Sequence, residues 1–452
     1  MLRGLAIVVV LAGAPLAAWA DALDELRAGF AAQGRGDLDE AIELYSSAID
    51  SGELSLEDCA VSLNNRASAN FAKGFHDLAI IDYDSAIGLR PDYGRAFNGR
   101  GVAYRVKGLY DLAIADFDAA IWLDANSFDA HYNRASVLDA QGLHQRAVSY
   151  YEAAMRLDGD HPFPFNGRGN AFRAMGLDDQ AIADYDTAIG LKPDFAEALY
   201  NRGDAYRAKG QYDRAIVDFD AAITLAPTDA RAFRRRGLAY LAKNLADRGI
   251  ADFDSAIRLR PDDAGAYKVR GDAHRQMGLH RPAIADYDAS IGLEPEYARA
   301  YFARGTSKFS LGRFDEAVRD FEIAIATNAD EELARVVLWL YVARKRAGRE
   351  GAAELLKSVD GVDLDAWPGP VAKLYLGGAS PAEVLEEAKN PDLRTQRSRQ
   401  CTAYFFVGQY YLIGGDLYGA SNMFRQAVAT GLRRMMAYQG AESELLRLGL
   451  KR

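Results

Sequence analysis

The sequence contains little of what several protein classes require. Only two of its 452 residues are cysteine, Cys59 and Cys401, which excludes a disulfide-framework fold and a zinc site built from four thiolates. The 54 lysines and arginines are outnumbered by 64 aspartates and glutamates, and this formal charge of −10 argues against nucleic acid as the main partner. Beyond the first twenty residues, no stretch approaches the roughly 18 consecutive apolar residues of a membrane-spanning helix.

The first twenty residues, MLRGLAIVVVLAGAPLAAWA, have the pattern of a secretory signal peptide. They contain one cation, Arg3, then an apolar run, then Ala18-Trp19-Ala20 before Asp21. We expect cleavage after Ala20, where no cysteine is present to accept a lipid. The sequence therefore predicts an exported protein without a membrane span or a lipid anchor, most simply in a bacterial periplasm.

A phrase of 34 residues repeats through most of the chain. Eight copies follow one another without a gap over 60–331, and an earlier copy covers 22–55. Within each contiguous copy, positions 8 and 20 are small and position 24 is Phe or Tyr. Small and apolar residues at spacings of three and four predict helices rather than strands. The small residues allow two antiparallel helices to approach closely, and the ring fills the space beside them.

Turn-forming residues divide each copy into two helices. Position 15 is Gly in seven copies and Asn244 in the other, which suits the left-handed conformation that ends a first helix. We expect Asp at position 18 to cap the second helix, Pro at position 32 to end it, and the polar residue at position 33 to cap the next first helix. The pattern predicts an all-α solenoid.

This pattern resembles the tetratricopeptide repeat across residues 22–331. The resemblance implies a right-handed superhelical solenoid of antiparallel helix pairs, whose first helices line a concave groove that binds peptides or proteins. The expected organisation is a signal peptide at 1–20, nine repeat units within 21–331, a degenerate helical repeat with a connecting segment at 332–400, and a last unit with a capping helix at 401–452.

The 34-residue pattern becomes irregular after residue 331. The loop signal Trp367-Pro368-Gly369-Pro370 precedes a short helix expected near 373–376. Ser380 is expected to cap another helix, and 394–399 is interpreted as a polar linker. The full phrase returns from Cys401, and 435–450 is expected to form an amphipathic helix that caps the array toward solvent.

A second resemblance covers part of this C-terminal region. The run Tyr404-Phe405-Phe406-Val407-Gly408-Gln409-Tyr410-Tyr411-Leu412, followed by Gly415-Asp416, is similar to the C-terminal region of NlpI-type envelope lipoproteins. That resemblance implies a periplasmic scaffold for proteins that remodel the cell wall and for an envelope protease. The chain differs from that family in its longer array and in having no lipid-accepting cysteine.

Motifs for catalysis are absent from the sequence. It has no H-E-x-x-H, G-x-S-x-G or phosphate-loop motif, and its six histidines form no i, i+4 pair. The G-x-G runs at Gly99 and Gly167 fall on packing positions of first helices. We therefore predict no enzyme, no metal and no cofactor. The two cysteines are expected to be unpaired, and Cys401, on a packed helix, to be buried.

Two positions carry opposite charges throughout the repeats. Position 7 is Arg in all eight contiguous copies and position 23 is Asp in seven, with Tyr150 as the exception. Position 7 lies beside the packing positions, which favours a structural ladder of Arg–Asp pairs. The alternative is that these arginines reach solvent or a ligand. The candidate pairs are Arg66–Asp82, Arg100–Asp116, Arg168–Asp184, Arg202–Asp218, Arg236–Asp252, Arg270–Asp286 and Arg304–Asp320. Aspartates at position 25 are expected to be solvated on the convex face.

The resemblance also places positions 2, 5, 9, 12 and 13 on the concave side. There the chain has nine basic and five acidic residues, a sign opposite to that of the whole protein. With amides and aromatic rings, this surface suits an extended polypeptide with acidic groups or a free C-terminal carboxylate. The alternative is an inner face that is merely solvated. The candidate groove residues are Asn98, Arg105, Asn166, Asn170, Arg173, Tyr200, Arg207, Arg234, Lys268, Arg275 and Phe302.

These observations favour a non-catalytic periplasmic scaffold or adaptor that binds envelope proteins or extended peptides, with cell-wall hydrolases or a protease as candidate partners. The alternative is an accessory protein that binds peptidoglycan or carbohydrate, in which the groove aromatics would stack on sugars. Homo-oligomerisation remains open.

Overall fold

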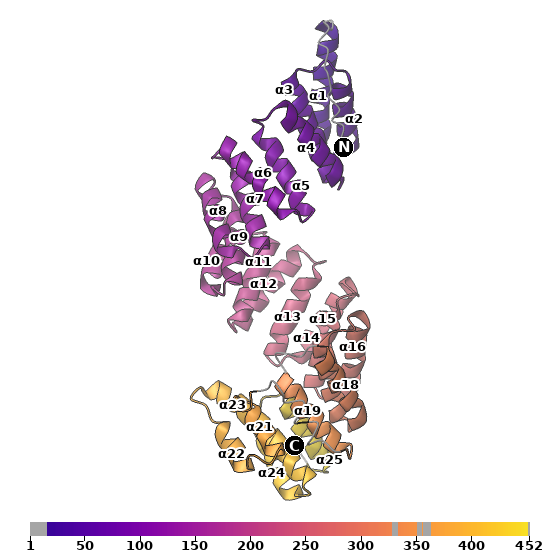
Figure 1. Cartoon of the computed structure of the whole chain (residues 1–452), viewed down its shortest axis with the longest axis vertical. Coiled ribbons are helices and arrows are strands. Elements are labelled where there is room, and N and C mark those ends of the chain that lie inside the picture. Colours follow the sequence, from indigo (N-terminus) through magenta and orange to yellow (C-terminus); the bar gives the residue numbers. More distant parts are fainter. Residues whose placement is uncertain (1–15, 328–332, 350–354, 356–362, 451–452) are drawn as a thin grey trace, which may run out of the picture. The chain divides into compact units, whose positions relative to one another are not determined.

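Helices are the only regular elements in the part of the chain that the structure describes. The computed structural model describes residues 16–327, 333–349, 355 and 363–450. The chain divides into two units, unit 1 with Met1–Lys209 and unit 2 with Gly210–Arg452. Within each unit, consecutive helices stack as pairs (Figure 1). The prediction of an all-α array of helix pairs is confirmed.

In unit 1, odd-numbered helices are the first and even-numbered helices the second of each pair. Its helices are α1 Leu16–Arg35, α2 Leu38–Asp50, α3 Leu56–Ala72, α4 His76–Leu89, α5 Gly94–Val106, α6 Tyr110–Leu123, α7 Phe128–Ala140, α8 His144–Leu157, α9 Pro162–Ala174, α10 Asp178–Leu191 and α11 Ala196–Ala208. The predicted signal-peptide residues before Leu16 lie outside the described residues, and α1 includes the predicted cleavage site after Ala20.

Unit 2 continues the alternation and then departs from it after α18. Its helices are α12 Tyr212–Leu225, α13 Ala230–Ala242, α14 Ala246–Leu259, α15 Ala264–Gln276, α16 His280–Leu293, α17 Ala298–Ser310, α18 Phe314–Ala326, α19 Leu333–Arg346, α21 Gly369–Tyr375, α22 Pro381–Glu387, α23 Leu393–Ile413, α24 Leu417–Ala429 and α25 Met436–Arg447. No described helix of either unit is long and apolar enough to cross a membrane.

The turn between paired helices is made by a residue with left-handed backbone. Gly108 has φ of 74°, its equivalents in the other copies have similar values, and Asn244 has φ of 61°. Asparagine tolerates this region better than most residues with a side chain. The prediction for position 15 is confirmed.

The predicted helix caps are wrong by one or two residues. The second helix α6 begins at Tyr110, so Asp111 lies inside its first turn and Leu109 holds the cap position without a side-chain hydrogen bond. Position 18 therefore supplies a negative charge near the positive end of the helix dipole rather than a cap. The cap residue of these first helices is at position 34 and not at position 33, and its side chain accepts a hydrogen bond where it is Ser or Asp, as in Ser127 and Asp263, but not in Tyr93 or Phe195. The turn after the position-32 proline is one residue longer than we expected.

Helix pairs are held close by a glycine or alanine that faces an aromatic ring. A Cβ atom added to Gly169 of α9 would lie 2.6 Å from Tyr185 Cε1 of α10, and one added to Gly101 would lie 2.7 Å from Phe117 Cε1. Gly99 and Gly167 face the ring of the preceding pair. A Cβ atom added to Gly99 would lie 2.5 Å from Tyr83 Cζ, and one added to Gly167 would lie 2.5 Å from Tyr151 Cε1. The G-x-G runs are therefore packing positions, as predicted.

First helices lie on the inner side of the stack within unit 1. Each first helix of this unit contacts the next first helix of the unit, for example α3 with α5 and α7 with α9. No two consecutive second helices of the described chain make comparable contact. A stack whose first helices are closer together than its second helices curves with the first helices inside. Their solvent-facing side chains therefore form the inner face of unit 1.

The C-terminal region of unit 2 forms a separate aromatic core. Trp339 of α19 stacks on Phe405 of α23 with ring centroids 4.8 Å apart, and Phe309 of α17 meets Trp339 edge-on at 5.1 Å. The returning repeat phrase packs as predicted, because Gly408 faces the ring of Phe424.

One prediction for this region is wrong. The supposed polar linker 394–399 is helical and belongs to α23, which Asp392 caps by accepting a hydrogen bond from the Thr395 N–H. The terminal helix α25 is amphipathic as expected, with one face buried. The capping box at Ser380 is present as expected.

The contact between Gly169 and Tyr185 predicts the effect of one added methyl group. Gly169→Ala would force the buried ring to move, and overpacking of this kind costs about 1–3 kcal/mol. We expect a lower midpoint in urea unfolding followed by circular dichroism. The matched control is Gly190→Ala in α10, where an added Cβ meets nothing within 4 Å. There we expect no loss of stability or a gain of about 0.4–1 kcal/mol. Equal effects of the two variants would contradict the packing argument.

Candidate binding surface

The structure places all predicted groove residues on first helices. In unit 1 they lie on α5, α9 and α11, and in unit 2 on α13, α15 and α17. Amides of neighbouring first helices are hydrogen-bonded to one another across the repeats. Asn133 Nδ2 donates to Asn98 Oδ1 at 3.0 Å, and Asn201 Nδ2 donates to Asn166 Oδ1 at 3.0 Å. Tyr185 donates to Asn170 Oδ1 at 2.7 Å.

Most predicted groove cations are paired with groove carboxylates. In unit 1, Asp204 is 1% exposed and binds both Arg173 and Arg207, the latter with 2.7 Å between Nε and Oδ1. In unit 2, Lys268 Nζ lies 2.7 Å from Asp272 Oδ2. Although burial opposes the charged form of Asp272, Lys268 and Arg275 hold the pKa of its carboxyl below its usual range. The expected positive surface is thus largely neutralised internally.

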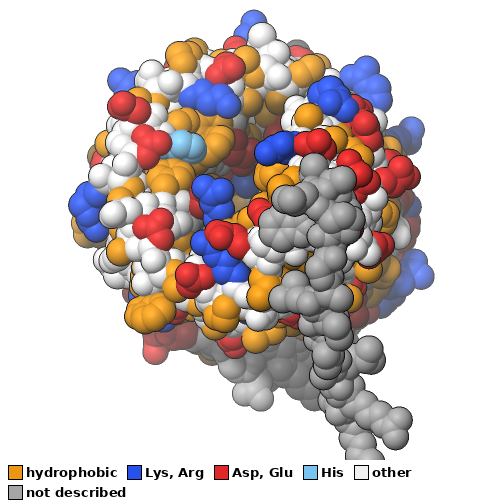
Figure 2. All heavy atoms as spheres, turned by 90° about the horizontal axis from the view of Figure 1, so that it is seen from above, with side chains coloured by type: hydrophobic (Ala, Val, Ile, Leu, Met, Phe, Trp, Pro, Cys, Tyr) orange, Lys and Arg blue, Asp and Glu red, His pale blue; other side chains and the backbone are white. Residues whose placement is uncertain are grey.

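Some groove donors nevertheless have no acceptor. The Nε atoms of Arg105 and Arg173 are buried and make no hydrogen bond within the described residues. Beside Arg173 is a hollow of about 570 Å³, lined also by Asn170 and Asn201. At the end of the chain where unit 1 begins, acidic and basic side chains are interspersed rather than segregated (Figure 2).

Helix α25 covers part of the face formed by the first helices of unit 2, which corrects part of the groove prediction. Helix α25 packs against α17, and Arg447 donates to the carbonyl oxygens of Phe309 and Ser310 at 3.2 and 3.0 Å. Arg275 donates to Gln439 of α25 and is 6% exposed, and Phe302 is 3% exposed. These two candidates are therefore not open groove residues. Arg234 lies 3.5 Å from Asp263, measured from Nε to Oδ2, and Tyr200 is half-buried on α11.

The Arg–Asp pairs are inter-helix contacts and not part of the binding face. Arg100 of α5 donates from Nε and Nη2 to both oxygens of Asp116, at 2.8 and 2.7 Å. The same geometry brings together Arg66 with Asp82, Arg168 with Asp184, Arg236 with Asp252, Arg270 with Asp286, and Arg304 with Asp320. The remaining predicted pair falls on different units, because Arg202 belongs to unit 1 and Asp218 to unit 2.

Each of these arginines also reaches back to the preceding pair. Arg100 Nη1 lies 2.5 Å from Oδ1 of Asp84, an aspartate at position 25 whose side chain is 51% exposed. The position-25 aspartates are therefore about half exposed but ion-paired, and the expectation that they are simply solvated is wrong. Hydrogen bonds to Asp116 and Asp84 raise the pKa of Arg100 against the effect of burial. Where Tyr150 replaces the aspartate, the Arg134 guanidinium lies over its ring at 3.9 Å.

No described residues form a metal or thiol centre. No group of three His, Cys, Asp or Glu side chains in the described residues is placed to hold a metal ion. Both cysteines are free, Cys401 is buried as predicted, and burial raises the pKa of its thiol to about 11. A thiol with so high a pKa is a poor nucleophile.

Sequence reasoning missed one site. A pocket in unit 2 is lined by five arginines, of which Arg394 and Arg399 fall in the supposed linker. The dense arginines around 394–399 and 433–434 were a visible signal, but no periodicity connects them.

The comparisons with known proteins agree with the repeat pattern. A tetratricopeptide repeat model matches residues 26–94, 66–130, 100–162, 234–298 and 268–332. A second model, described as TPR repeat, matches 169–206 and 203–244. These matches end at residue 332, so the similarity of the C-terminal region to NlpI-type lipoproteins stays a prediction from the sequence.

Solved repeat proteins match parts of the chain. A tetratricopeptide repeat protein from Parabacteroides merdae is 22% identical, with a TM-score of 0.45, over 55% of this chain and 98% of its own. YrrB, described as a TPR protein with an unusual peptide-binding site, is 22% identical, with a TM-score of 0.34, over 41% and 95%. PilF of Pseudomonas aeruginosa is 19% identical, with a TM-score of 0.40, over 43% and 89%.

The two kinds of ion pair predict different costs of removal. Arg100→Ala leaves Asp116, 5% exposed, without its partner, and breaking such a pair costs about 3–5 kcal/mol. The control is Lys107→Ala, which removes an exposed pair with Asp77 and should cost about 0–1 kcal/mol. Thermal unfolding followed by circular dichroism measures both. A melting temperature of Arg100→Ala equal to that of Lys107→Ala would contradict a structural role for the ladder.

Proposed function

Because the chain belongs to the tetratricopeptide repeat family, we propose that it is a non-catalytic scaffold that binds proteins or extended peptides on the inner face of unit 1. The finer part of the proposal is an exported adaptor in the bacterial periplasm that binds envelope proteins, with cell-wall hydrolases or a protease as candidate partners. The N-terminal sequence and the C-terminal resemblance support that part.

One observation carries the choice of surface. The Nε donors of Arg105 and Arg173 are buried without an acceptor, and a hollow of about 570 Å³ lies open beside Arg173. A buried donor without a partner costs about 1–3 kcal/mol, and a ligand that supplies an acceptor recovers that energy. Peptide carbonyl and carboxylate oxygens are such acceptors. Amides on the same face, such as Asn170, can bond a peptide backbone.

The proposed surface can be tested by capture from an envelope extract. The intact protein is immobilised in three forms: wild type, Arg105→Gln with Arg173→Gln, and the control Arg146→Gln with Arg156→Gln. The control changes two exposed arginines of the second helix α8. We expect wild type and control to retain the same proteins and the first double variant to bind them about a hundredfold more weakly or worse, since two lost charged hydrogen bonds cost about 1.5–3 kcal/mol each. Melting temperatures verify folding.

Two outcomes would contradict the proposal. Equal capture by all three forms would exclude the inner face of unit 1 as the site. Binding of the wild type to purified sacculi, with no protein retained from the extract, would favour the alternative of a carbohydrate-binding accessory protein.

The proposed export has its own test. Expressed in a Gram-negative host, the full chain is expected in the osmotic-shock fraction with Asp21 as its first residue, because the enzyme that removes signal peptides cuts after A-x-A patterns. Intact-mass spectrometry measures this, and a variant without residues 5–16 is the control that should stay in the cytoplasm. A wild-type protein that keeps Met1 and remains in the cytoplasm would contradict export.

A further inference from the structure

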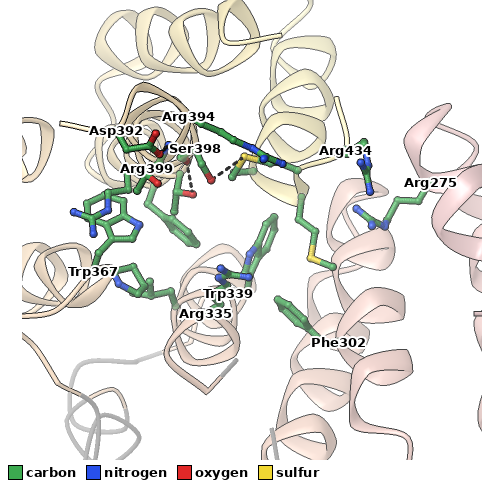
Figure 3. Close-up of a pocket in the computed structure, with 18 residues that line it drawn as sticks. Arg275, Phe302, Arg335, Trp339, Trp367, Asp392, Arg394, Ser398, Arg399 and Arg434 are labelled. Carbon is green, nitrogen blue, oxygen red and sulfur yellow. Dashed lines mark hydrogen bonds between the residues drawn. The ribbon is translucent and has the colours of Figure 1, made fainter. Parts of the chain in front are cut away.

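A pocket in unit 2 lies where the last regular repeats meet the irregular C-terminal helices. Its volume is about 890 Å³, and it is lined from the repeat helices α15 and α17, from α19 and α23, from the segment before α21, and from the start of α25 with the segment that leads into it. Trp339 and Phe302 lie near its centre, with Arg275 and Arg434 on one side and Trp367 and Arg399 on the other (Figure 3). The pocket is distinct from the inner face of unit 1.

The floor of the pocket is apolar and belongs to the aromatic core. Phe302, Leu338, Trp339 and Phe406 are all at most 3% exposed. Met435 and Met436 complete the wall, and flexible thioether side chains adapt to different apolar groups. A ligand can therefore bury hydrocarbon or an aromatic ring here.

The rim of the pocket is strongly basic. Five arginines line it, and Asp392 is the one acid among the lining residues. That carboxylate caps α23 through the Thr395 N–H, at 2.7 Å, and this bond lowers its pKa. Arg275 is already bound by Asp272 and Gln439.

Among the described residues, the other four arginines have no carboxylate partner. No acidic oxygen of the described chain lies within 4.0 Å of the guanidinium nitrogens of Arg335, Arg394, Arg399 or Arg434. Arg399 lies over the ring of Trp367, with its Cζ atom 5.8 Å from the ring centroid. This contrasts with the ladder, where every arginine in position 7 has a carboxylate partner. Like charges gathered at a cavity with low-dielectric walls attract an anion.

We propose that this pocket binds an acidic peptide segment of a partner protein, with carboxylates on Arg335, Arg394 and Arg434 and an apolar side chain against Trp339 and Phe302. The proposal rests on the protein-binding function above and names a second site for it. Guanidinium groups match carboxylates in geometry, and a peptide presents carboxylates and an aromatic ring at neighbouring positions. A neutral sugar would leave the cations unpaired, and a purely anionic chain would leave the apolar floor empty.

The test uses the full chain and three fluorescent hexapeptides, read by anisotropy. The first alternates Glu with Phe and Leu, the second replaces each Glu by Gln, and the third keeps Glu but replaces Phe and Leu by Gly. We expect the first to bind and the other two to bind at least about tenfold more weakly, since each loses either the charged or the apolar contacts. Higher salt should weaken the first peptide most.

Matched variants locate the site. Arg335→Gln with Arg434→Gln should weaken the first peptide about tenfold or more. The control, Arg397→Gln with Arg425→Gln, removes the same charge from exposed positions of α23 and α24 outside the pocket and should leave affinity unchanged. Equal melting temperatures exclude unfolding as the cause.

Three results would overturn the inference: equal affinity of both double variants, equal affinity of the first and third peptides, or binding of a heparin oligosaccharide with no binding of the first peptide. If the peptide fails to bind while the unit 1 variant still loses its captured proteins, this inference falls and the proposed function stands.

Discussion

The close approach of two helices at a glycine or alanine facing an aromatic ring is the contact on which the repeat region depends. Gly101 against Phe117 and Gly169 against Tyr185 leave no room for a further carbon atom. Because that contact recurs every 34 residues, each pair presents the same edges to the next, and the chain extends by stacking. The bidentate arginines then connect neighbouring second helices, as Arg100 does through Asp116 and Asp84.

Most charged side chains in the repeats form ion pairs with one another. The ladder arginines and most groove cations have carboxylate partners at close range, and Asp204 and Asp272 each bind two cations. Against this background, an arginine without a carboxylate partner is informative. Arg105 in unit 1, and the pocket arginines of unit 2 other than Arg275, are candidates for binding because no carboxylate of the described residues neutralises them.

The two units offer different surfaces. In unit 1 the inner face of the first helices carries amides and unsatisfied donors beside an open hollow. In unit 2 helix α25 occupies part of the equivalent face, burying Phe302 and bonding Arg275. The same arrangement of helices builds the arginine-rich pocket, so a partly open site takes the place of an open groove there.

The sequence by itself determined the helix pairs, their turns at Gly108 and Asn244, the ring contacts and the position-23 partners of the ladder arginines, but not their second partners at position 25. These features depend on contacts within one repeat or between adjacent repeats. The residues that make them are therefore close in the sequence, and the same pattern recurs in eight contiguous copies. Capping was off by one or two residues, because a cap depends on where the turn ends and not on periodicity.

Only the tertiary structure decided that Arg275 meets Gln439, 164 positions away, and that residues 394–399 begin a helix at a pocket. Such contacts join segments that share no repeating pattern, so nothing in the spacing of residues specifies them. The burial of Phe302 likewise depends on where α25 packs, which is set by the shape of the aromatic core as a whole.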